Sequence, residues 1–180
     1  KKYQPDNSTK IIRAHAFDYD RYMEEEMGFN GKNFLPYEQF AVYIDSNISS
    51  HPGFMLKNYY PKPHVSTEKY YPEINNFFDH FTNQTGLKVV IAIHPRTNIF
   101  DQGNLFEDRD IISNRTVSLI KNARIVLSHT STAINYAVLY NKPIILIDSN
   151  NYNHRFRSEF KSYELSLGVK RINISENIIA

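Results

Sequence analysis

Apolar residues along the chain gather in short runs, and each run stops at polar residues. The clearest runs are "FAVYI" at 40–44, "KVVIAI" at 88–93, "RIVLS" at 124–128 and "IILID" at 144–148. Unbroken apolar runs of this length are typical of parallel strands, because helices cover both faces of such a sheet. The pattern therefore predicts four buried strands.

Between these runs the apolar residues follow a helical period. The segment "YYPEINNFFDHFTNQTG" has them three and four positions apart, at Ile74, Phe77, Phe78 and Phe81. It predicts a helix with Pro72 in its first turn and Gly86 at its C-terminal cap. Three more helices are predicted at 116–123, at 132–140 with Asn141 as cap, and at 158–168, before a last strand at 169–174. This alternation predicts a doubly wound, mostly parallel, Rossmann-like α/β sheet.

Two segments near the start of the chain, residues 1–37 and 50–72, lack such a period. Residues 1–37 contain an acidic cluster at 24–26 and two glycines, and we interpret them as a lead-in, the tail of an N-terminal domain outside this chain. Residues 38–180 are then one Rossmann-like domain. Prolines and two tyrosine pairs between 50 and 72 predict a long aromatic loop.

Composition narrows the function classes. The net charge of +2 is too balanced to indicate nucleic-acid binding, the chain has no cysteine, and no apolar run approaches the roughly 18–20 residues of a membrane helix. We expect a soluble cytoplasmic protein, with peripheral association at the inner face of the membrane as an alternative. The chain begins with Lys-Lys and ends in "SENIIA", which we interpret as a fragment that alone could be inactive.

Polar residues follow every apolar run, and this places the candidate chemistry. In an open parallel sheet, ligands bind beyond the carboxyl ends of the strands. Those positions hold Asp45 and Ser46, then "HPR" at 94–96, then "SHTST" at 128–132, then Asp148 and Ser149. We predict that the ends at 94 and 131 face one site.

A phosphate fits the predicted start of the helix at 132–140. Ser131 or Thr132 would cap the helix, and its N–H groups would bind an anion. His94 would neutralise charge on a departing phosphate, Arg96 would clamp it, and Ser128 would add a hydroxyl. The structural alternatives are that Ser131 and Thr132 only cap the helix, that His94 only ends a strand, and that Arg96 lies on the surface.

Other polar residues are secondary candidates. Asp45 could hold a sugar hydroxyl or act as a base, and His51, His129 and Asn135 could contact the sugar. The seven histidines lack the spacing of a zinc site, so we expect no metal and no cofactor. The sequence also lacks G-x-G-x-x-G, the P-loop and G-x-S-x-G, which disfavours dinucleotide, NTPase and serine-hydrolase functions.

The order of these motifs resembles a known group of enzymes. A strand ending in His-Pro at 94–95, followed about thirty-five residues later by a strand leading to Ser/Thr-Ser/Thr at a helix start, resembles the nucleotide-binding C-terminal half of bacterial GT-B glycosyltransferases. The sialyltransferases and polysialyltransferases of surface-polysaccharide synthesis are the nearest comparison, over residues 38 to 150. Their acidic D/E-D/E-G triplet has no counterpart here.

The resemblance implies a metal-independent transferase of capsule or lipopolysaccharide synthesis. It would bind a nucleotide-sugar donor and a glycan or glycolipid acceptor, with His94 on the donor phosphate and Ser131 and Thr132 at the helix start. The donor nucleotide stays open among CMP, CDP, UDP and GDP. Two alternatives remain: a sugar-nucleotide epimerase of the same fold, and a non-catalytic interaction module.

Overall fold

The protein folds around one parallel β-sheet. The computed structural model describes residues 10, 14–28, 38–50, 63–97 and 104–176. Six strands lie in the order β3-β2-β1-β4-β5-β6, and every neighbouring pair is parallel. The strands are β1 (Phe40–Ile44), β2 (Lys88–Ala92), β3 (Ile111–Ile112), β4 (Ile125–Ser128), β5 (Ile144–Asp148) and β6 (Arg171–Asn173). The predicted doubly wound, Rossmann-like α/β fold is confirmed.

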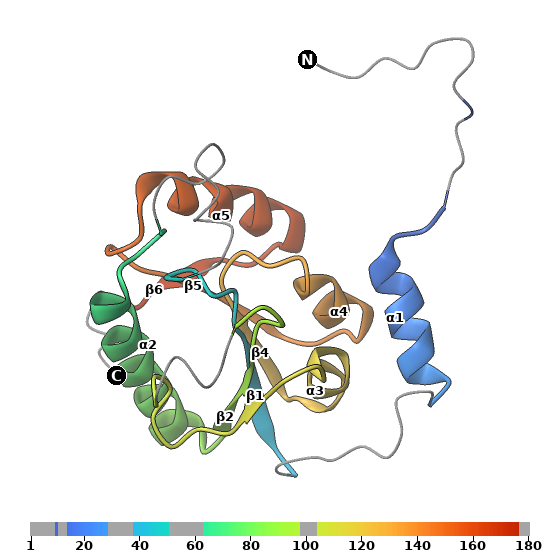
Figure 1. Cartoon of the computed structure of the whole chain (residues 1–180), viewed down its shortest axis with the longest axis horizontal. Coiled ribbons are helices and arrows are strands. Elements are labelled where there is room, and N and C mark those ends of the chain that lie inside the picture. Colours follow the sequence, from blue (N-terminus) through green and yellow to red (C-terminus); the bar gives the residue numbers. More distant parts are fainter. Residues whose placement is uncertain (1–9, 11–13, 29–37, 51–62, 98–103, 177–180) are drawn as a thin grey trace.

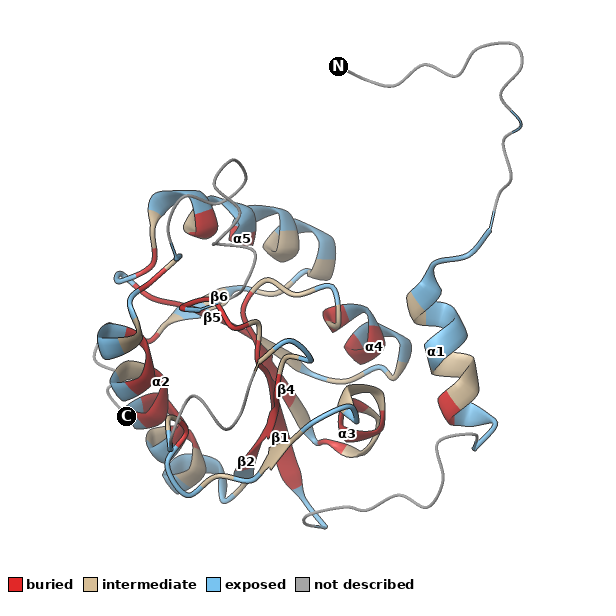
Figure 2. Ribbon diagram, viewed as in Figure 1, coloured by how far each residue is buried: buried red, intermediate tan, exposed pale blue. Residues whose placement is uncertain are grey.

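Helices cover the sheet on both sides, which explains the unbroken apolar runs. α2 (Thr67–Thr85) lies on one side, and α3 (Thr116–Asn122) and α4 (Ile134–Leu139) lie on the other, while α5 (His154–Leu167) runs beside β5 and β6 (Figure 1). All five residues of the central strand β1 are buried. Figure 2 shows that the buried positions follow the central strands and the inner faces of the helices.

The helix ends agree with the sequence at the C-termini and at the start of α3, whereas α2, α4 and α5 begin elsewhere than predicted. Gly86 ends α2 in the left-handed conformation and donates to the carbonyl of Thr82, and Asn141 has a positive φ just after α4. Pro72, however, lies inside α2 and not in its first turn. Helix α5 begins at His154, four residues before the predicted start.

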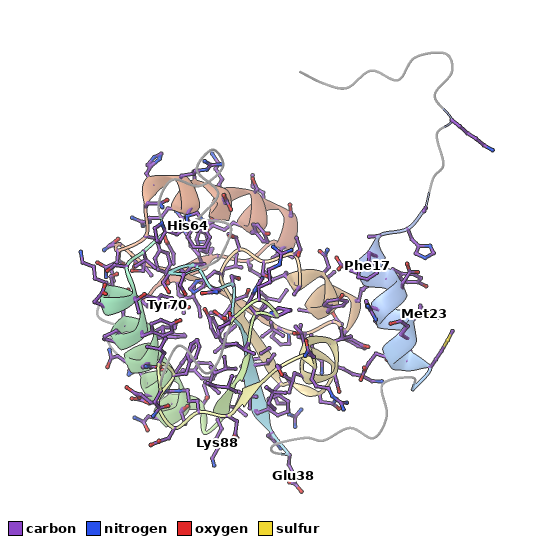
Figure 3. All side chains as sticks on the ribbon, viewed as in Figure 1. Phe17, Met23, Glu38, His64, Tyr70 and Lys88 are labelled. Carbon is purple, nitrogen blue, oxygen red and sulfur yellow. The ribbon has the colours of Figure 1, made fainter. Side chains whose placement is uncertain are left out.

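Tyr70 and Tyr71 belong to α2, so the prediction of a loop through 72 was wrong for this part. Both side chains are buried, and Figure 3 shows Tyr70 turned toward the interior of the domain. The Tyr70 hydroxyl contacts the Tyr43 hydroxyl and lies 3.2 Å from Nε2 of His129. These buried contacts stabilise the part of α2 that precedes Pro72. Local sequence rules would instead place this proline in the first turn. The other pair, Tyr59 and Tyr60, lies outside the described residues.

A helix also forms within the predicted lead-in. α1 (Phe17–Glu26) packs beside α3 and α4 (Figure 1). The rings of Tyr22 and Tyr140 lie 4.9 Å apart, and Lys121 of α3 forms a 2.9 Å ion pair with Glu26. Packing on the domain, rather than a strong amphipathic period, accounts for this helix.

The order of the strands creates a crevice. From β1 the chain adds β2 and then β3 on one side, and it returns to add β4 on the other side of β1. This is the strand order of a Rossmann sheet, in which the reversal between β1 and β4 opens a ligand crevice at the carboxyl ends. None of the described helices is long and apolar enough to cross a membrane.

Candidate functional site

A cavity of about 720 Å³ lies at this edge of the sheet. Its wall combines the ends of β1 and β2, the starts of α3 and α4, and one side of α1. Four of the predicted site residues line it: Asp45, His94, Ser131 and Thr132. The two strand ends singled out in the sequence therefore face one cavity.

Asp45 places a buried carboxylate in the cavity wall. Its Oδ1 accepts a 2.9 Å hydrogen bond from the backbone N–H of Asn47, and its Oδ2 accepts a 3.2 Å hydrogen bond from that of His94. Burial raises the pKa of Asp45 to about 6, although these two N–H donors oppose the shift. At neutral pH the group is largely ionised and can accept a proton just below neutrality.

His94 is held beside Asp45 at the end of β2. The Arg96 backbone N–H donates to Nδ1 of His94 over 3.1 Å. A ring nitrogen that accepts a hydrogen bond carries no proton, so a neutral His94 has its proton on Nε2. The ring can therefore donate a hydrogen bond from Nε2 whether or not it is charged.

The start of α4 differs from the expected helix at 132–140. The helix begins at Ile134 after Ala133, and no side chain of the described residues caps it. Ser131 Oγ accepts a 3.3 Å hydrogen bond from the Ala133 N–H. A helix of one and a half turns has only a small dipole, so the hydroxyls of Ser131 and Thr132 are the main polar groups here.

A second contribution to the cavity, from the start of α3, was not predicted from the sequence. Asn114, Arg115 and Thr116 line the cavity, and Asn114 has a φ of 56°. They follow the two-residue strand β3, whose "II" is too short to stand out as an apolar run. Recognition of β3 in the sequence would have predicted this contribution, because residues that follow a parallel strand lie at the carboxyl edge of the sheet.

Two predicted phosphate or sugar contacts are buried in the core. Ser128 and His129 have no exposed surface and do not line the cavity. His129 Nδ1 lies 2.7 Å from the carbonyl oxygen of Ile147, and burial lowers the pKa of His129 to about 4. His129 is thus a neutral core residue among aromatic rings, which corrects its assignment as a sugar contact.

Two other candidates lie outside the cavity wall. The Arg96 side chain is exposed and does not line the cavity, in agreement with the alternative of a surface residue. Asn135 donates through Nδ2 to Oδ2 of Asp18 over 2.7 Å, so it binds α1 rather than the cavity. His51 lies outside the described residues.

Acidic and basic side chains are mixed in the cavity wall. Besides Asp45, α1 contributes Asp18, Arg21 and Glu25, and α3 contributes Arg115. The described residues contain no group of three or more histidine, aspartate or glutamate side chains arranged to hold a metal ion. The cavity offers nitrogen and hydroxyl donors that can bind an anion, and three carboxylates lie in the same wall.

Comparison with known proteins adds no argument to the geometry. No protein family and no curated protein matches the sequence. Among solved structures, the chain is similar to a protein described as the glycotransferase of kitacinnamycin, with 13% identity and a TM-score of 0.44. The alignment covers 81% of this chain and 33% of that one, so the chain spans about a third of its length. We infer function from the cavity alone.

Proposed function

We propose that the chain is the nucleotide-sugar-binding domain of a GT-B-type glycosyltransferase that acts without a metal ion. The observation that carries the proposal is the meeting of His94, Asp45, Ser131 and Thr132 in one cavity at the reversal point of a parallel sheet. This is the position where open α/β sheets bind nucleotides. Capsule or lipopolysaccharide synthesis, with a glycan or glycolipid acceptor, is the proposed setting.

In the proposed reaction the bond between the sugar carbon and the donor phosphate oxygen breaks. The electron pair stays on that oxygen, where the His94 Nε2–H and the hydroxyls of Ser131 and Thr132 stabilise the charge. The acceptor hydroxyl oxygen forms the new bond to the sugar carbon. Asp45 takes the proton that the acceptor loses, a role that suits a carboxylate with a pKa of about 6.

Binding of free nucleotides tests the first half of this proposal. We expect one of CMP, CDP, UDP and GDP to raise the melting temperature of the chain in a titration, because a ligand that binds only the folded state stabilises it. His94→Ala should abolish the shift, and His154→Ala, a change of an exposed histidine at the start of α5, should leave it intact. A shift that survives in His94→Ala would contradict the role of His94.

Turnover tests the second half. In the complete enzyme, His94→Ala should lower turnover by roughly 10²–10³-fold, the loss typical of one group that stabilises developing charge. Undiminished turnover would exclude that role. Conversion of a UDP-sugar without any acceptor would instead identify an epimerase, and a chain indifferent to all nucleotides would be an interaction module.

A further inference from the structure

Helix α1 forms part of the cavity although it lies outside the sheet and its crossover helices. It contributes Phe17, Asp18, Arg21 and Glu25 to the wall. Phe17 lies on the side of α1 that faces α4 (Figure 3), and 66% of its surface is exposed. The ring therefore borders the open space of the cavity.

Hydrogen bonds fix where α1 sits. The Asp18 carboxylate accepts from Nδ2 of Asn135 over 2.7 Å and from the Tyr136 hydroxyl over 3.3 Å. Both donors belong to α4, directly after the Ser131 and Thr132 turn. The position of α1 is therefore tied to the same turn that we assign to the phosphate.

Arg21 lies one helical turn after Asp18 and is held by its neighbours. Its NH1 group donates to Oε2 of Glu24 over 2.8 Å, and its guanidinium carbon lies 5.1 Å from the centre of the Phe17 ring. A guanidinium has five N–H donors, and one of them suffices for the bond to Glu24. Contacts to Phe17 and Glu24 reduce the entropy that Arg21 would lose on binding a ligand.

We propose that Arg21 binds the phosphate of the nucleotide from the α1 side of the cavity, and that Asp18 and Asn135 are positioning residues that hold it there. This inference rests on the proposed function and adds a binding group from outside the Rossmann-like sheet. A planar guanidinium suits a phosphate, to which it can donate two parallel hydrogen bonds. The exposed Asn135 then acts through α1, without contact to the ligand.

Calorimetric titration of the full chain with CMP, CDP, UDP and GDP tests the inference. For the nucleotide that binds, we expect Arg21→Gln to weaken affinity about 10-fold and Arg21→Lys to recover part of it, because charge-assisted hydrogen bonds are strong and lysine keeps the charge. Asn135→Ala should weaken affinity about 3-fold. Asn83→Ala, a change of an exposed asparagine on α2, is the matched control and should have no effect.

The double variant separates positioning from general destabilisation. If Asn135 acts only by placing Arg21, Arg21→Gln with Asn135→Ala should bind no more weakly than Arg21→Gln alone. Additive losses, or binding that ignores Arg21, would overturn this inference and leave the proposed function standing. If no nucleotide binds the wild-type chain, the proposed function fails and this inference fails with it.

Discussion

Asp45 has a buried carboxylate that costs the fold stability. Only 4% of the residue is exposed, and the rise of its pKa from 3.8 to about 6 corresponds to ~3 kcal/mol of unfavourable free energy at neutral pH. Because the folded state holds this proton more tightly than the unfolded state, the cost disappears as the pH falls from 6 to 4. A carboxyl whose pKa is raised in this way at a cavity wall is typical of functional sites.

Asp45→Asn should therefore stabilise the chain while it impairs transfer. We expect a gain of about 2 kcal/mol at pH 7, because the ~3 kcal/mol cost of burial is relieved and about 1 kcal/mol is lost with the hydrogen bond that an amide nitrogen cannot accept from the His94 N–H. Urea unfolding from pH 7 to pH 4 would show this gain shrink. Asp108→Asn, at an exposed position, is the control, and equal behaviour of the two variants would contradict the assignment.

His129 has the opposite pH dependence. Burial lowers its pKa from 6.5 to about 4, so the unfolded state binds the proton more tightly. Stability that is complete above pH 6.5 should fall by up to ~3 kcal/mol as the pH drops to 4. The effect overlaps with that of Asp45 and is best measured in Asp45→Asn, where the contribution of Asp45 is absent.

His129→Gln in that background should flatten the slope of stability between pH 6.5 and pH 4. It should also lower stability at pH 7, because the contacts of His129 with Ile147 and Tyr70 are disturbed. His154→Gln supplies the comparison at an exposed site. A slope that persists in His129→Gln would mean that another group titrates in this window.

At the scale of elements, one buried carboxylate connects α5 with two strands of the sheet. Asp148, at the end of β5 and 1% exposed in its side chain, accepts from Nε and NH2 of Arg157 on α5 over 3.0–3.2 Å, and Nε of Arg171 on β6 lies 3.4 Å away. These contacts join a helix and two strands. The sequence identified Asp148 only as a polar strand end, because its cationic partners lie 9 and 23 positions further along the chain.

Arg157→Ala should lower the free energy of unfolding by about 2–3 kcal/mol. Removal of one partner leaves Asp148 buried with weaker compensation, and the partial exposure of Arg157 keeps the loss below that of a fully buried pair. Lys161→Ala, at an exposed site on the same helix, should change it by less than about 0.5 kcal/mol. Equal losses in both variants would show that the ion pair with Asp148 is not responsible.

Elements with a strong local signal were predictable, and those that depend on distant contacts were not. The apolar runs identified β1, β2, β4 and β5, and Gly86 identified the end of α2. In contrast, α1 forms where its residues meet α3 and α4, and the first turns of α2 depend on the contacts of Tyr70 in the core. Local sequence rules carry no information on such partners.

For the whole molecule, the rule that ligands bind beyond parallel strand ends located the cavity. It placed Asp45 and His94 at the same edge of the sheet, although they are 49 residues apart in the sequence. The same rule misplaced His129, because a polar residue after a strand can turn into the core as readily as into the crevice. Arg21 and Arg115 were missed, because neither follows an apolar run that the sequence displays.

A structure of the chain with the nucleotide that it binds tests the central claim most directly. We predict that the phosphate lies in the cavity between α1, α3 and α4, within hydrogen-bond distance of Nε2 of His94. A nucleotide bound elsewhere on the domain, with this cavity empty at a saturating concentration, would contradict the account.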